Sequence, residues 1–354
     1  MSGAYKIYLE VGKNIAKVKS TSYLYEVSRL LLHRLVTGYG PDHYVTYSLF
    51  KKPINLREWR EYLDKKDFCT MLLAHNKKAN FRVLEDKVAF GRQCLLHDLP
   101  HPKIHFTVRY TADDYSFPNY SYSDVGQAFE SLADGNYIVK TCYGSYGINL
   151  WSVTKTAAGL LIHNDGSLNT ATQFAERLAA TQECYLVQDK VEVAHHFREI
   201  MPGNASGSIR VHSFLRPDGS ITAPYVLVKL TTLGTVCDNF AGGGTGNMLA
   251  MIDMENQCFG YVLRKTEDGL LAEISHHPDT GVDLRRYPFN DLEVAQALAH
   301  RCASAFNQVP AVGWDILSTA QGPLVLEGNP MFDPAGPQLC ASRGVKSIIP
   351  RLLA

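Results

Sequence analysis

The sequence lacks an excess of charge, closely spaced cysteines and any long apolar run. Lys and Arg number 35 against 35 Asp and Glu, so the overall charge offers no broad attraction to nucleic acid or to an anionic membrane. The eight cysteines are scattered, without the close pairs that zinc sites and redox motifs require. No apolar stretch approaches the roughly 20 residues of a membrane span, and the N-terminus shows no export signal. We therefore expect a soluble cytoplasmic protein with reduced thiols and no nucleic-acid or membrane partner.

The residues that are present are typical of a globular α+β protein. Hydrophobic residues make up 45% of the 354 residues, enough for a large core and about two domains. Helical spacing of apolar residues dominates the first 100 residues and predicts helices over 22–36, 56–66 and 81–96. The stripe that we expect to face the core in the first of them is Leu24, Val27, Leu31 and Leu35. After residue 100, short predicted strands alternate with helices over 123–133, 170–181 and 290–308.

Two carboxylates and an amide meet on a predicted hairpin near the C-terminus. Apolar runs over 312–317 and 324–326 flank a Thr-Ala-Gln-Gly turn, which places Asp315 opposite Glu327. Asn329 shares their face, because side chains on a strand alternate with a period of two. Opposed side chains lie about 5 Å apart, so the two carboxylates repel each other unless a cation lies between them. Oxygen donors of this kind suit Mg²⁺. The alternative is a hairpin whose acids face solvent.

A second predicted hairpin has a glycine-rich tip. A short strand ends in Lys140 and is followed by Thr-Cys-Tyr-Gly-Ser-Tyr-Gly and another strand. Gly144 and Gly147 would let backbone N–H groups approach an anion, as phosphate-binding loops do, although a plain turn has the same composition. The Walker motif is missing, and the run Gly-Gly-Gly-Thr-Gly-Asn from Gly242 has the wrong spacing and context for a dinucleotide fingerprint. The sequence therefore disfavours Walker and Rossmann sites.

Three further cations, Lys87, Arg210 and Lys229, stand in predicted helices or strands. Arg210 and Lys229 belong to partner strands of a hairpin over 209–230 that turns at Asp218-Gly219. The two cations would lie roughly across from one another and repel unless an anion bridges them. A polyphosphate or an acyl phosphate would do so. Alternatively, either side chain extends into solvent from its strand.

Short segments between about residue 75 and residue 335 occur in a distinctive order. They are Glu85-Asp-Lys87, Ile138-Val-Lys140, Tyr143-Gly-Ser-Tyr-Gly147, Leu186-Val-Gln188-Asp189, Ser208-Ile-Arg210-Val, Cys237-Asp-Asn-Phe-Ala-Gly-Gly-Gly244, His277-Pro-Asp-Thr-Gly281, Gly313-Trp-Asp315 and Glu327-Gly-Asn329. In this order they resemble the ATP-grasp superfamily, and in detail its sugar-transfer-associated branch. The resemblance implies an ATP-grasp fold, in which two α+β subdomains over 101–184 and 185–354 clasp ATP. A mainly helical region over 1–100 precedes them.

The resemblance also implies roles for individual residues. Lys87 and Lys140 match lysines that contact the nucleotide phosphates, and Ser145, Tyr146 and Gly147 match the loop above them. The strand that reads adenine is matched by Gln188, Asp189 and Val191. The matched Mg²⁺ ligands are Asp315, Glu327 and Asn329, and the matched catalytic cations are Arg210 and Lys229. The expected substrate-binding residues are Asp238, Asn239, Gly243, His277 and Asp279.

Two positions and one histidine pair depart from the family pattern. Lys229 stands where the family has arginine, which keeps the charge but loses the bidentate fork. Tyr146 stands where the family loop often has a smaller or basic residue. The pair, His195-His196, lies one position from the histidine expected there, so no ribose contact is assigned to it. The first departure leaves open whether Lys229 replaces the arginine functionally.

The activity implied by the resemblance is ATP-dependent ligation of a carboxylate to an amine, with ATP and Mg²⁺ as cofactors. ATP would phosphorylate the carboxylate, and the amine would displace phosphate from the acyl phosphate. Small-molecule carboxylate and amine substrates from polysaccharide or specialised-metabolite biosynthesis are the expected partners. The alternatives are a kinase-like phosphotransferase and a non-catalytic ATP-binding regulatory module. The sequence leaves the oligomeric state open, a homodimer included.

Overall fold

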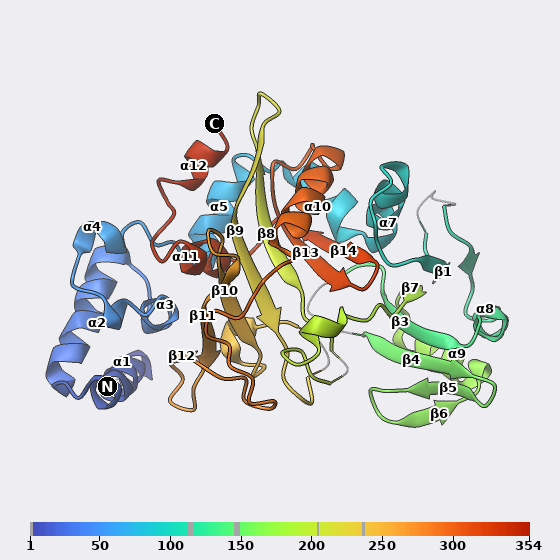
Figure 1. The fold of residues 1–354 in the computed structure, drawn as a ribbon, viewed down its shortest axis with the longest axis horizontal. Helices are drawn as coiled ribbons and strands as arrows, with labels where there is room; N and C mark the ends of the chain where they lie inside the picture. Colours follow the sequence, from blue (N-terminus) through green and yellow to red (C-terminus); the bar gives the residue numbers. More distant parts are fainter. Residues whose placement is uncertain (1–2, 112–115, 145–148, 204, 236–237) are drawn as a thin grey trace.

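The computed structural model describes residues 3–111, 116–144, 149–203, 205–235 and 238–354. Its N-terminal part is helical, and the first four α-helices lie together at one end of the molecule (Figure 1). The helices are α1 (Gly3–Lys19), α2 (Tyr23–Thr37), α3 (Pro41–Thr46), η1 (Leu49–Lys51), α4 (Leu56–Trp59), α5 (Lys65–Leu73), η2 (Lys78–Asn80), α6 (Arg82–Glu85) and α7 (Lys87–Leu96).

The first sheet has the strand order β2-β1-β7-β3-β4-β5-β6. Its strands are β1 (Ile104–Val108), β2 (Asn119–Tyr120), β3 (Gly135–Thr141), β4 (Trp151–Thr156), β5 (Gly159–Ile162), β6 (Ser167–Asn169) and β7 (Tyr185–Asp189). Helices α8 (Val125–Ser131) and α9 (Ala171–Thr181) pack on it through a core that includes Phe129, Phe174 and Leu178. Thr170 caps α9 in a capping box with Gln173.

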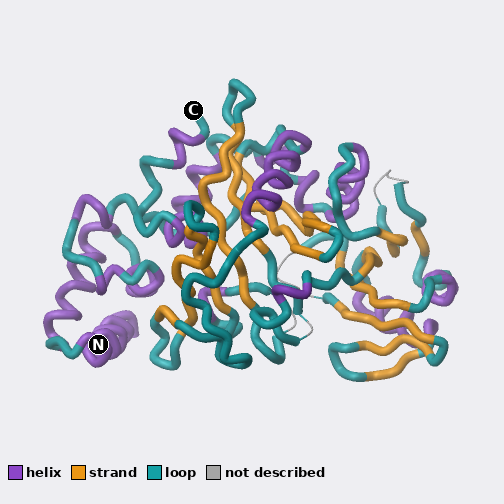
Figure 2. The backbone as a smooth tube through the Cα atoms, in the orientation of Figure 1, coloured by secondary structure: helices purple, strands orange, loops and turns teal. Residues whose placement is uncertain are grey.

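The second sheet has the order β12-β11-β10-β9-β8-β13-β14. Its strands are β8 (Ile209–Leu215), β9 (Ile221–Leu230), β10 (Met248–Asp253), β11 (Cys258–Lys265), β12 (Leu271–Ile274), β13 (Ala311–Thr319) and β14 (Gly322–Asn329). The other elements of this half are η3 (His195–Phe197), η4 (Ala241–Gly243), α10 (Leu292–Ala305), α11 (Ala335–Cys340) and α12 (Ile349–Leu352). Figure 2 shows the strands gathered in two groups, one per sheet.

Both faces of the second sheet are covered, and successive residues of β9 show how. Val226 and Val228 pack in the cluster that contains α10, whereas Leu227 packs with Tyr44, Trp59 and other residues of the N-terminal helices. The alternation follows from the two-residue period of a strand. The N-terminal helices therefore form one wall of the layer that carries β8, β13 and β14.

The predicted β-hairpins and the long C-terminal helix are confirmed. Strands β8 and β9 pair on either side of the turn at Gly219, and β13 pairs with β14 across the Thr-Ala-Gln-Gly turn. Helix α10 begins after Asp291 and buries its predicted apolar side from Leu292 to Cys302. Period-two and period-3.6 patterns with clear turn residues were sufficient here.

The predicted buried stripe of the helix over 22–36 is wrong. Leu24 and Leu35 are 75% and 83% exposed, whereas Glu26, Arg29, Leu30 and His33 are buried. The buried charges have partners, because Glu26 accepts hydrogen bonds from Lys19 Nζ (2.8 Å) and Thr21 Oγ1 (2.9 Å). Arg29 donates to the carbonyls of residues 49, 50 and 52. Polar groups thus occupy the face turned to the core, and they are only partly satisfied, because Glu26 Oε2, Arg29 Nε and His33 Nδ1 have no hydrogen-bond partner among the described residues.

Two predicted helices are each broken by an aspartate that caps a new helix. The helix predicted over 56–66 stops at Trp59, and Asp64 begins α5 by accepting the N–H of Asp67 at 2.8 Å. The helix predicted over 81–96 is interrupted at Asp86, whose Oδ1 accepts the N–H groups of Val88 and Ala89. Aspartate is a strong N-cap. The second break places Lys87 in the first turn of α7.

Gly344 is expected to be essential for docking the N-terminal helices. A Cβ at this position would lie 2.1 Å from the carbonyl carbon of Glu61 and 2.3 Å from the amide nitrogen of Tyr62. Both atoms belong to the backbone, so the two segments must separate. We expect Gly344→Ala to lower the free energy of unfolding by about 1–3 kcal/mol, measured by urea denaturation.

Gly126→Ala is the matched control. It lies in α8, and the nearest atoms to an added Cβ are 3.8 Å away, so alanine there should leave stability unchanged or raise it by about 0.5 kcal/mol or more. A Gly344→Ala protein as stable as the wild type would contradict the close approach.

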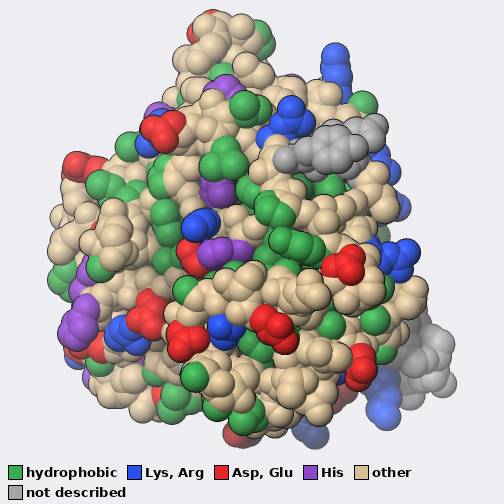
Figure 3. All heavy atoms as spheres, turned by 90° about the vertical axis from the view of Figure 1, so that its right-hand side faces the viewer, with side chains coloured by type: hydrophobic (Ala, Val, Ile, Leu, Met, Phe, Trp, Pro, Cys, Tyr) green, Lys and Arg blue, Asp and Glu red, His purple; other side chains and the backbone are tan. Residues whose placement is uncertain are grey.

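Acidic and basic side chains are interspersed on the face shown in Figure 3, which is the side of the first sheet. Among the described residues, no helix combines the length and the apolar character needed to span a bilayer.

Candidate active site

A cavity of about 1090 Å³ is lined by residues of both sheets and of the N-terminal helices. The first sheet contributes Ile138 and Lys140 from β3 and Gln188 from β7. The second sheet contributes side chains from β8, β9, β13 and β14, and the loop around Asn239 closes one side. The volume lies just above the roughly 300–1,000 Å³ of small-molecule sites, which suits two molecules bound together.

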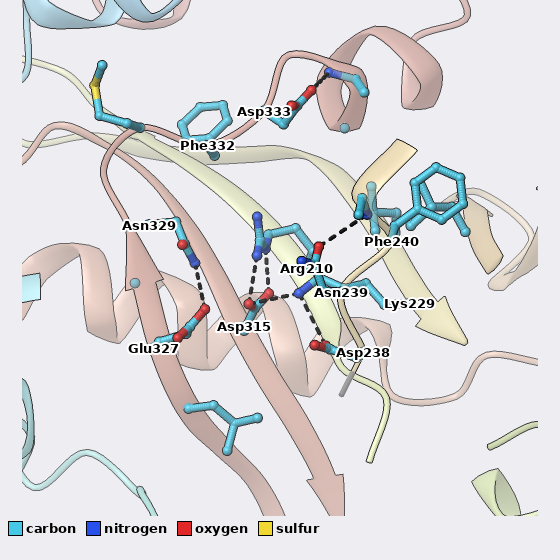
Figure 4. A pocket seen from close by; sticks show the side chains of 18 of the residues that line it. Arg210, Lys229, Asp238, Asn239, Phe240, Asp315, Glu327, Asn329, Phe332 and Asp333 are labelled. Atoms are coloured by element: carbon cyan, nitrogen blue, oxygen red, sulfur yellow. Dashed lines mark hydrogen bonds and ion pairs between the residues drawn. The ribbon is translucent and has the colours of Figure 1, made fainter. Parts of the chain in front are cut away.

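A buried charge cluster forms the floor of this cavity, shown in Figure 4. Asp315 on β13 is the register partner of Arg210 on β8. The guanidinium binds it twice, with Nε to Oδ1 and Nη2 to Oδ2 at 2.6 Å. Lys229 Nζ lies 2.9 Å from the same Oδ2. The predicted anion between Arg210 and Lys229 is therefore supplied, in this structure, by Asp315.

The electrostatics of the cluster favour its charged form. Burial alone would raise the pKa of Asp315, but Arg210 and Lys229 outweigh burial and hold it well below its usual range. Burial and Arg210 would lower the pKa of Lys229, but Asp238 and Asp315 raise it overall. Lys229 Nζ also lies 3.2 Å from Asp238 Oδ2, which accepts the hydroxyl of Ser208. Both cations therefore stay protonated at neutral pH.

The predicted register of Asp315 opposite Glu327 is confirmed. Glu327 Oε1 accepts a hydrogen bond from Asn329 Nδ2 at 3.3 Å. Burial raises the pKa of Glu327, and the nearby Asp315 carboxylate raises it further, against the opposing effect of Lys229, Arg210 and Lys140. A carboxylate whose charge is disfavoured by its surroundings is suited to binding a cation.

The donor set fits Mg²⁺. Among the described residues, no three His, Cys, Asp or Glu side chains form a metal site, so the candidate donors are two carboxylates and one amide oxygen. A carboxylate has about four lone-pair positions, and Arg210 and Lys229 occupy three of those of Asp315. One position on Oδ1 is left. Glu327 and the Oδ1 atom of Asn329 complete a set of hard oxygen donors.

Two lysines approach the floor from the other side of the cavity. Lys87 Nζ donates to the carbonyl of Gly144 at 2.7 Å, and the Lys87 backbone N–H donates to the carbonyl of Cys142. The start of α7 is thereby attached to the end of β3. Burial lowers the pKa of Lys140 to about 8, and the positive charge of Lys87 contributes to the shift. Two neighbouring ammonium groups facing a cavity favour a polyanionic ligand.

An apolar slot lies beside the lysines. Ile138 of the first sheet and Leu317 and Leu326 of the second sheet line it, together with Gln188, Asp189 and Val191. Asp189 is fixed by His105, whose Nε2 lies 2.6 Å from Oδ1. Apolar side chains and the end of β7 thus line the same slot, and such a slot is suited to a planar base. All three residues that were assigned to adenine recognition thus line the cavity.

The structure brings some of the predicted substrate residues to the cavity and not others. Asp238 and Asn239 line it, whereas Gly243, His277 and Asp279 are not among the lining residues. His277 is buried, with Nε2 3.1 Å from the Thr231 carbonyl and Nδ1 near the Asp279 N–H. A Cβ on Gly243 would lie 2.3 Å from Lys265 Cβ. These contacts show that His277 and Gly243 take part in the packing of the loops. Their roles in substrate binding stay predictions.

The glycine-rich loop is only partly described. Gly144 lines the cavity, but Ser145, Tyr146 and Gly147 lie outside the described residues. Their assignment to the nucleotide phosphates is therefore a prediction.

Sequence reasoning missed cavity residues outside the predicted motifs. His212 follows Arg210 by two positions on β8 and so shares its face, which the hairpin prediction could have shown. Other cavity residues carried no local signal, because tertiary packing decides their position. Examples are Asp42, Thr46, Tyr47, Asp64 and Asp333.

A family model described as sugar-transfer associated ATP-grasp matches residues 69–352. The chain belongs to the sugar-transfer associated ATP-grasp family. The predicted family and the predicted ATP-grasp fold are thereby confirmed. No curated protein matches the chain. Residues 1–68, some of which line the cavity, lie outside the part of the chain that the family model matches.

Solved structures of ATP-grasp enzymes are similar to the chain at low identity. N5-carboxyaminoimidazole ribonucleotide synthetase from Thermotoga maritima is 13% identical over 76% of this chain and 49% of its own, with a TM-score of 0.36. D-alanyl-alanine synthetase A from Vibrio cholerae is 12% identical over 77% and 65%, with a TM-score of 0.43. D-alanine–D-alanine ligase from Bacillus anthracis, complexed with ATP, is 9% identical over 77% and 66%, with a TM-score of 0.39. The chain thus spans about half the length of the first of these proteins.

Proposed function

We propose that the protein is an ATP-dependent ligase that joins a carboxylate to an amine through an acyl phosphate. The observation that carries the proposal is the convergence of cations and oxygen donors on one cavity. Lys87 and Lys140 face Arg210, Lys229 and the Asp315, Glu327 and Asn329 set across it. Phosphoryl transfer needs such positioning and charge neutralisation more than it needs a covalent protein nucleophile.

The first step transfers the γ-phosphoryl group of ATP to the substrate carboxylate, with ADP as the leaving group. Lys87 and Lys140 bind the phosphates, and the base enters the slot beside Gln188 and Val191. Arg210 and Lys229 stabilise the charge that develops on the transferred group, because their donors are already oriented by Asp315. Asp315, Glu327 and Asn329 would hold Mg²⁺, which would supply positive charge to neutralise the phosphates.

The second step forms the amide. The amine nitrogen attacks the acyl carbon, the bond from that carbon to the phosphate oxygen breaks, and inorganic phosphate leaves. As the C–N bond forms, the nitrogen loses a proton, which the departing phosphate takes up. Arg210, beside the departing phosphate, stabilises its negative charge. The proposal includes subdomains over 101–184 and 185–354 and a cytoplasmic location, where ATP is available and the cysteines that the structure describes remain free thiols.

Hydroxylamine trapping tests the proposal. The protein is incubated with Mg·ATP, hydroxylamine and pools of carboxylic acids, including those of polysaccharide and peptide-like biosynthesis. An acyl phosphate reacts with hydroxylamine to give a hydroxamate and phosphate, so hydroxamate and ADP should form in equal amounts. ADP together with a stable phosphorylated product, and without hydroxamate, would favour a phosphotransferase. Nucleotide binding without ADP formation from any pool would favour a regulatory module.

Nucleotide binding should be accompanied by proton uptake at Lys140. The pKa of this lysine is about 8 in the free protein, so at pH 8 about half of the side chain is unprotonated. Polyphosphate beside it raises the pKa and draws in up to about half a proton per ATP. Titration calorimetry at pH 8 in buffers of different ionisation enthalpy measures this uptake.

Lys140→Met should abolish this proton uptake, whereas Lys103→Met, a change at an exposed lysine, should not. Equal uptake by the wild type and Lys140→Met would assign the proton to another group.

A further inference from the structure

The N-terminal helices contribute a wall of the cavity. The family model begins at residue 69, yet the cavity is also lined by Asp42, His43, Thr46, Tyr47, Asp64 and Lys65. These residues belong to α3, its C-terminal end and the start of α5. A part of the chain outside the family match therefore borders the same space as Arg210 and Glu327.

This wall is held rigidly in place. The backbone N–H of Leu63 donates to Gln338 Oε1 at 2.7 Å, and Gln338 Nε2 returns a hydrogen bond to the Leu63 carbonyl at 3.0 Å. The N–H of Lys346 donates to the Glu61 carbonyl at 3.0 Å. Tyr44, Tyr47 and Trp59 share a buried cluster with Leu227 and Leu249 of the second sheet. Side chains on such a support are positioned before a ligand arrives.

The end of the cavity beside this wall is apolar in its depth. Leu227, Leu249, Leu271, Phe240, Phe332 and Leu339 line it. It adjoins the charge cluster, because a Cβ on Gly313 would contact both Phe332 (3.1 Å) and Arg210 Cδ (3.2 Å). Figure 4 shows Phe332 and Asp333 on one side of Arg210 and Phe240 on another. A molecule in this space would reach the proposed site of phosphoryl transfer.

The mouth of the same end is acidic. Asp42 and Asp333 are exposed, Asp64 is partly exposed, and Lys65 is the one lysine or arginine that the N-terminal wall adds to the cavity lining. His43 and His212 add no positive charge at neutral pH, because burial lowers the pKa of each to about 3. The pKa of the Tyr47 hydroxyl is raised first by burial and then by the carboxylates of Asp333 and Asp64.

We propose that this end binds the amine substrate, and that the amine is an aliphatic diamine or a similar cation with an apolar body. The inference rests on the proposed ligase function and names the substrate class of its second step. Ammonium groups match the acidic mouth, and methylene groups match the leucine and phenylalanine walls. An amine that carries a carboxylate or phosphate meets the three acids and is disfavoured.

A matched pair of amines tests the substrate class. 1,5-Diaminopentane and free lysine differ by one carboxylate. With a carboxylic acid that gives hydroxamate in the trapping assay, amide formation is measured with each amine. We expect the kcat/KM for 1,5-diaminopentane to exceed that for free lysine at least tenfold. Equal values, or a preference for free lysine, would overturn the inference. The proposed ligase function would stand as long as the hydroxamate forms.

A double variant tests the residues. Asp42→Asn with Asp333→Asn removes two charges, and asparagine at 333 can still accept the Ala335 N–H that Asp333 accepts at 2.8 Å. We expect the KM for the diamine to rise by about fivefold for each exposed carboxylate removed, because exposed ion pairs contribute about that factor. The ratio of diamine-dependent to hydroxylamine-dependent rate should fall in parallel, since hydroxylamine carries no charge at neutral pH.

Glu10→Gln, an exposed acid on α1 away from the cavity lining, is the matched control and should keep the wild-type ratio. An unchanged ratio in the double variant would contradict the assignment of the amine to this end. A fall in both rates to the same degree would also contradict it, because the change would then lie in the first step.

Discussion

Glu327→Gln is expected to abolish ADP formation while the protein keeps or gains stability. Glutamine preserves the shape but removes the charge that would face Mg²⁺, so the rate of hydroxamate-coupled ADP release should fall by about 100-fold or more. Binding of a fluorescent ATP analogue should lose its dependence on Mg²⁺. Burial and Asp315 raise the pKa of Glu327, so its ionised form costs stability at neutral pH. A neutral side chain relieves this cost.

Glu267→Gln is the matched control, because Glu267 is exposed and lies outside the cavity lining. It should retain turnover and Mg²⁺ dependence. Near-normal turnover in Glu327→Gln would refute the ligand role. A large loss of stability in Glu327→Gln would instead show that its carboxylate is part of the structural framework.

Asp315→Asn is expected to have the opposite effect on stability. It removes the carboxylate that binds Arg210 twice and Lys229 once, and the two cations stay buried. Breaking a buried ion pair on one side typically costs about 3–5 kcal/mol, because a charge is left without its partner. Urea unfolding at pH 7 should show this loss, and activity should be lost with it.

The pH dependence gives an internal check. The folded-state pKa of Asp315 is lowered, so its stabilising effect is complete above its unfolded pKa of about 4 and is lost as the pH falls below that value. The stability difference between wild type and Asp315→Asn should therefore shrink at pH below about 4. A triple variant with Arg210→Met, Lys229→Met and Asp315→Leu should recover most of the stability without activity. A constant difference across pH would contradict the ion-pair origin.

The sequence predicted the strands that carry the site better than the helices that enclose it. The pairing of Asp315 with Glu327 was predicted correctly, but the turn alone does not give it. Ile316 pairs with Val325, and a bulge between Asp315 and Ile316 then brings Glu327 opposite Asp315. The ion pair of Asp315 with Arg210 could not be predicted, because β8 and β13 lie about 100 residues apart in the sequence and become neighbours only in the folded sheet. No local pattern specifies which strands become neighbours.

The error in α2 has a similar physical cause. Leu24, Leu31 and Leu35 form a regular stripe, and regular stripes usually face a core. The core instead takes Glu26 and Arg29, whose partners are Lys19 and the carbonyls of residues 49, 50 and 52. A buried charge is tolerated only when tertiary structure supplies its partners, which a single helix cannot reveal. The helix breaks at Asp64 and Asp86 could have been predicted from the sequence, since aspartate is a strong N-cap.

The pairing of β8 with β13 has a consequence for biosynthesis. Arg210 and Lys229 are synthesised about a hundred residues before Asp315. The hydrogen bonds of Glu61 with Lys346 and of Leu63 with Gln338 join segments that are still further apart in the sequence. Contacts of such long sequence separation form slowly and late. A nascent or truncated chain that stops before β13 would therefore hold Arg210 without its carboxylate partner and Lys229 with Asp238 alone, and would be a target for chaperones and proteases.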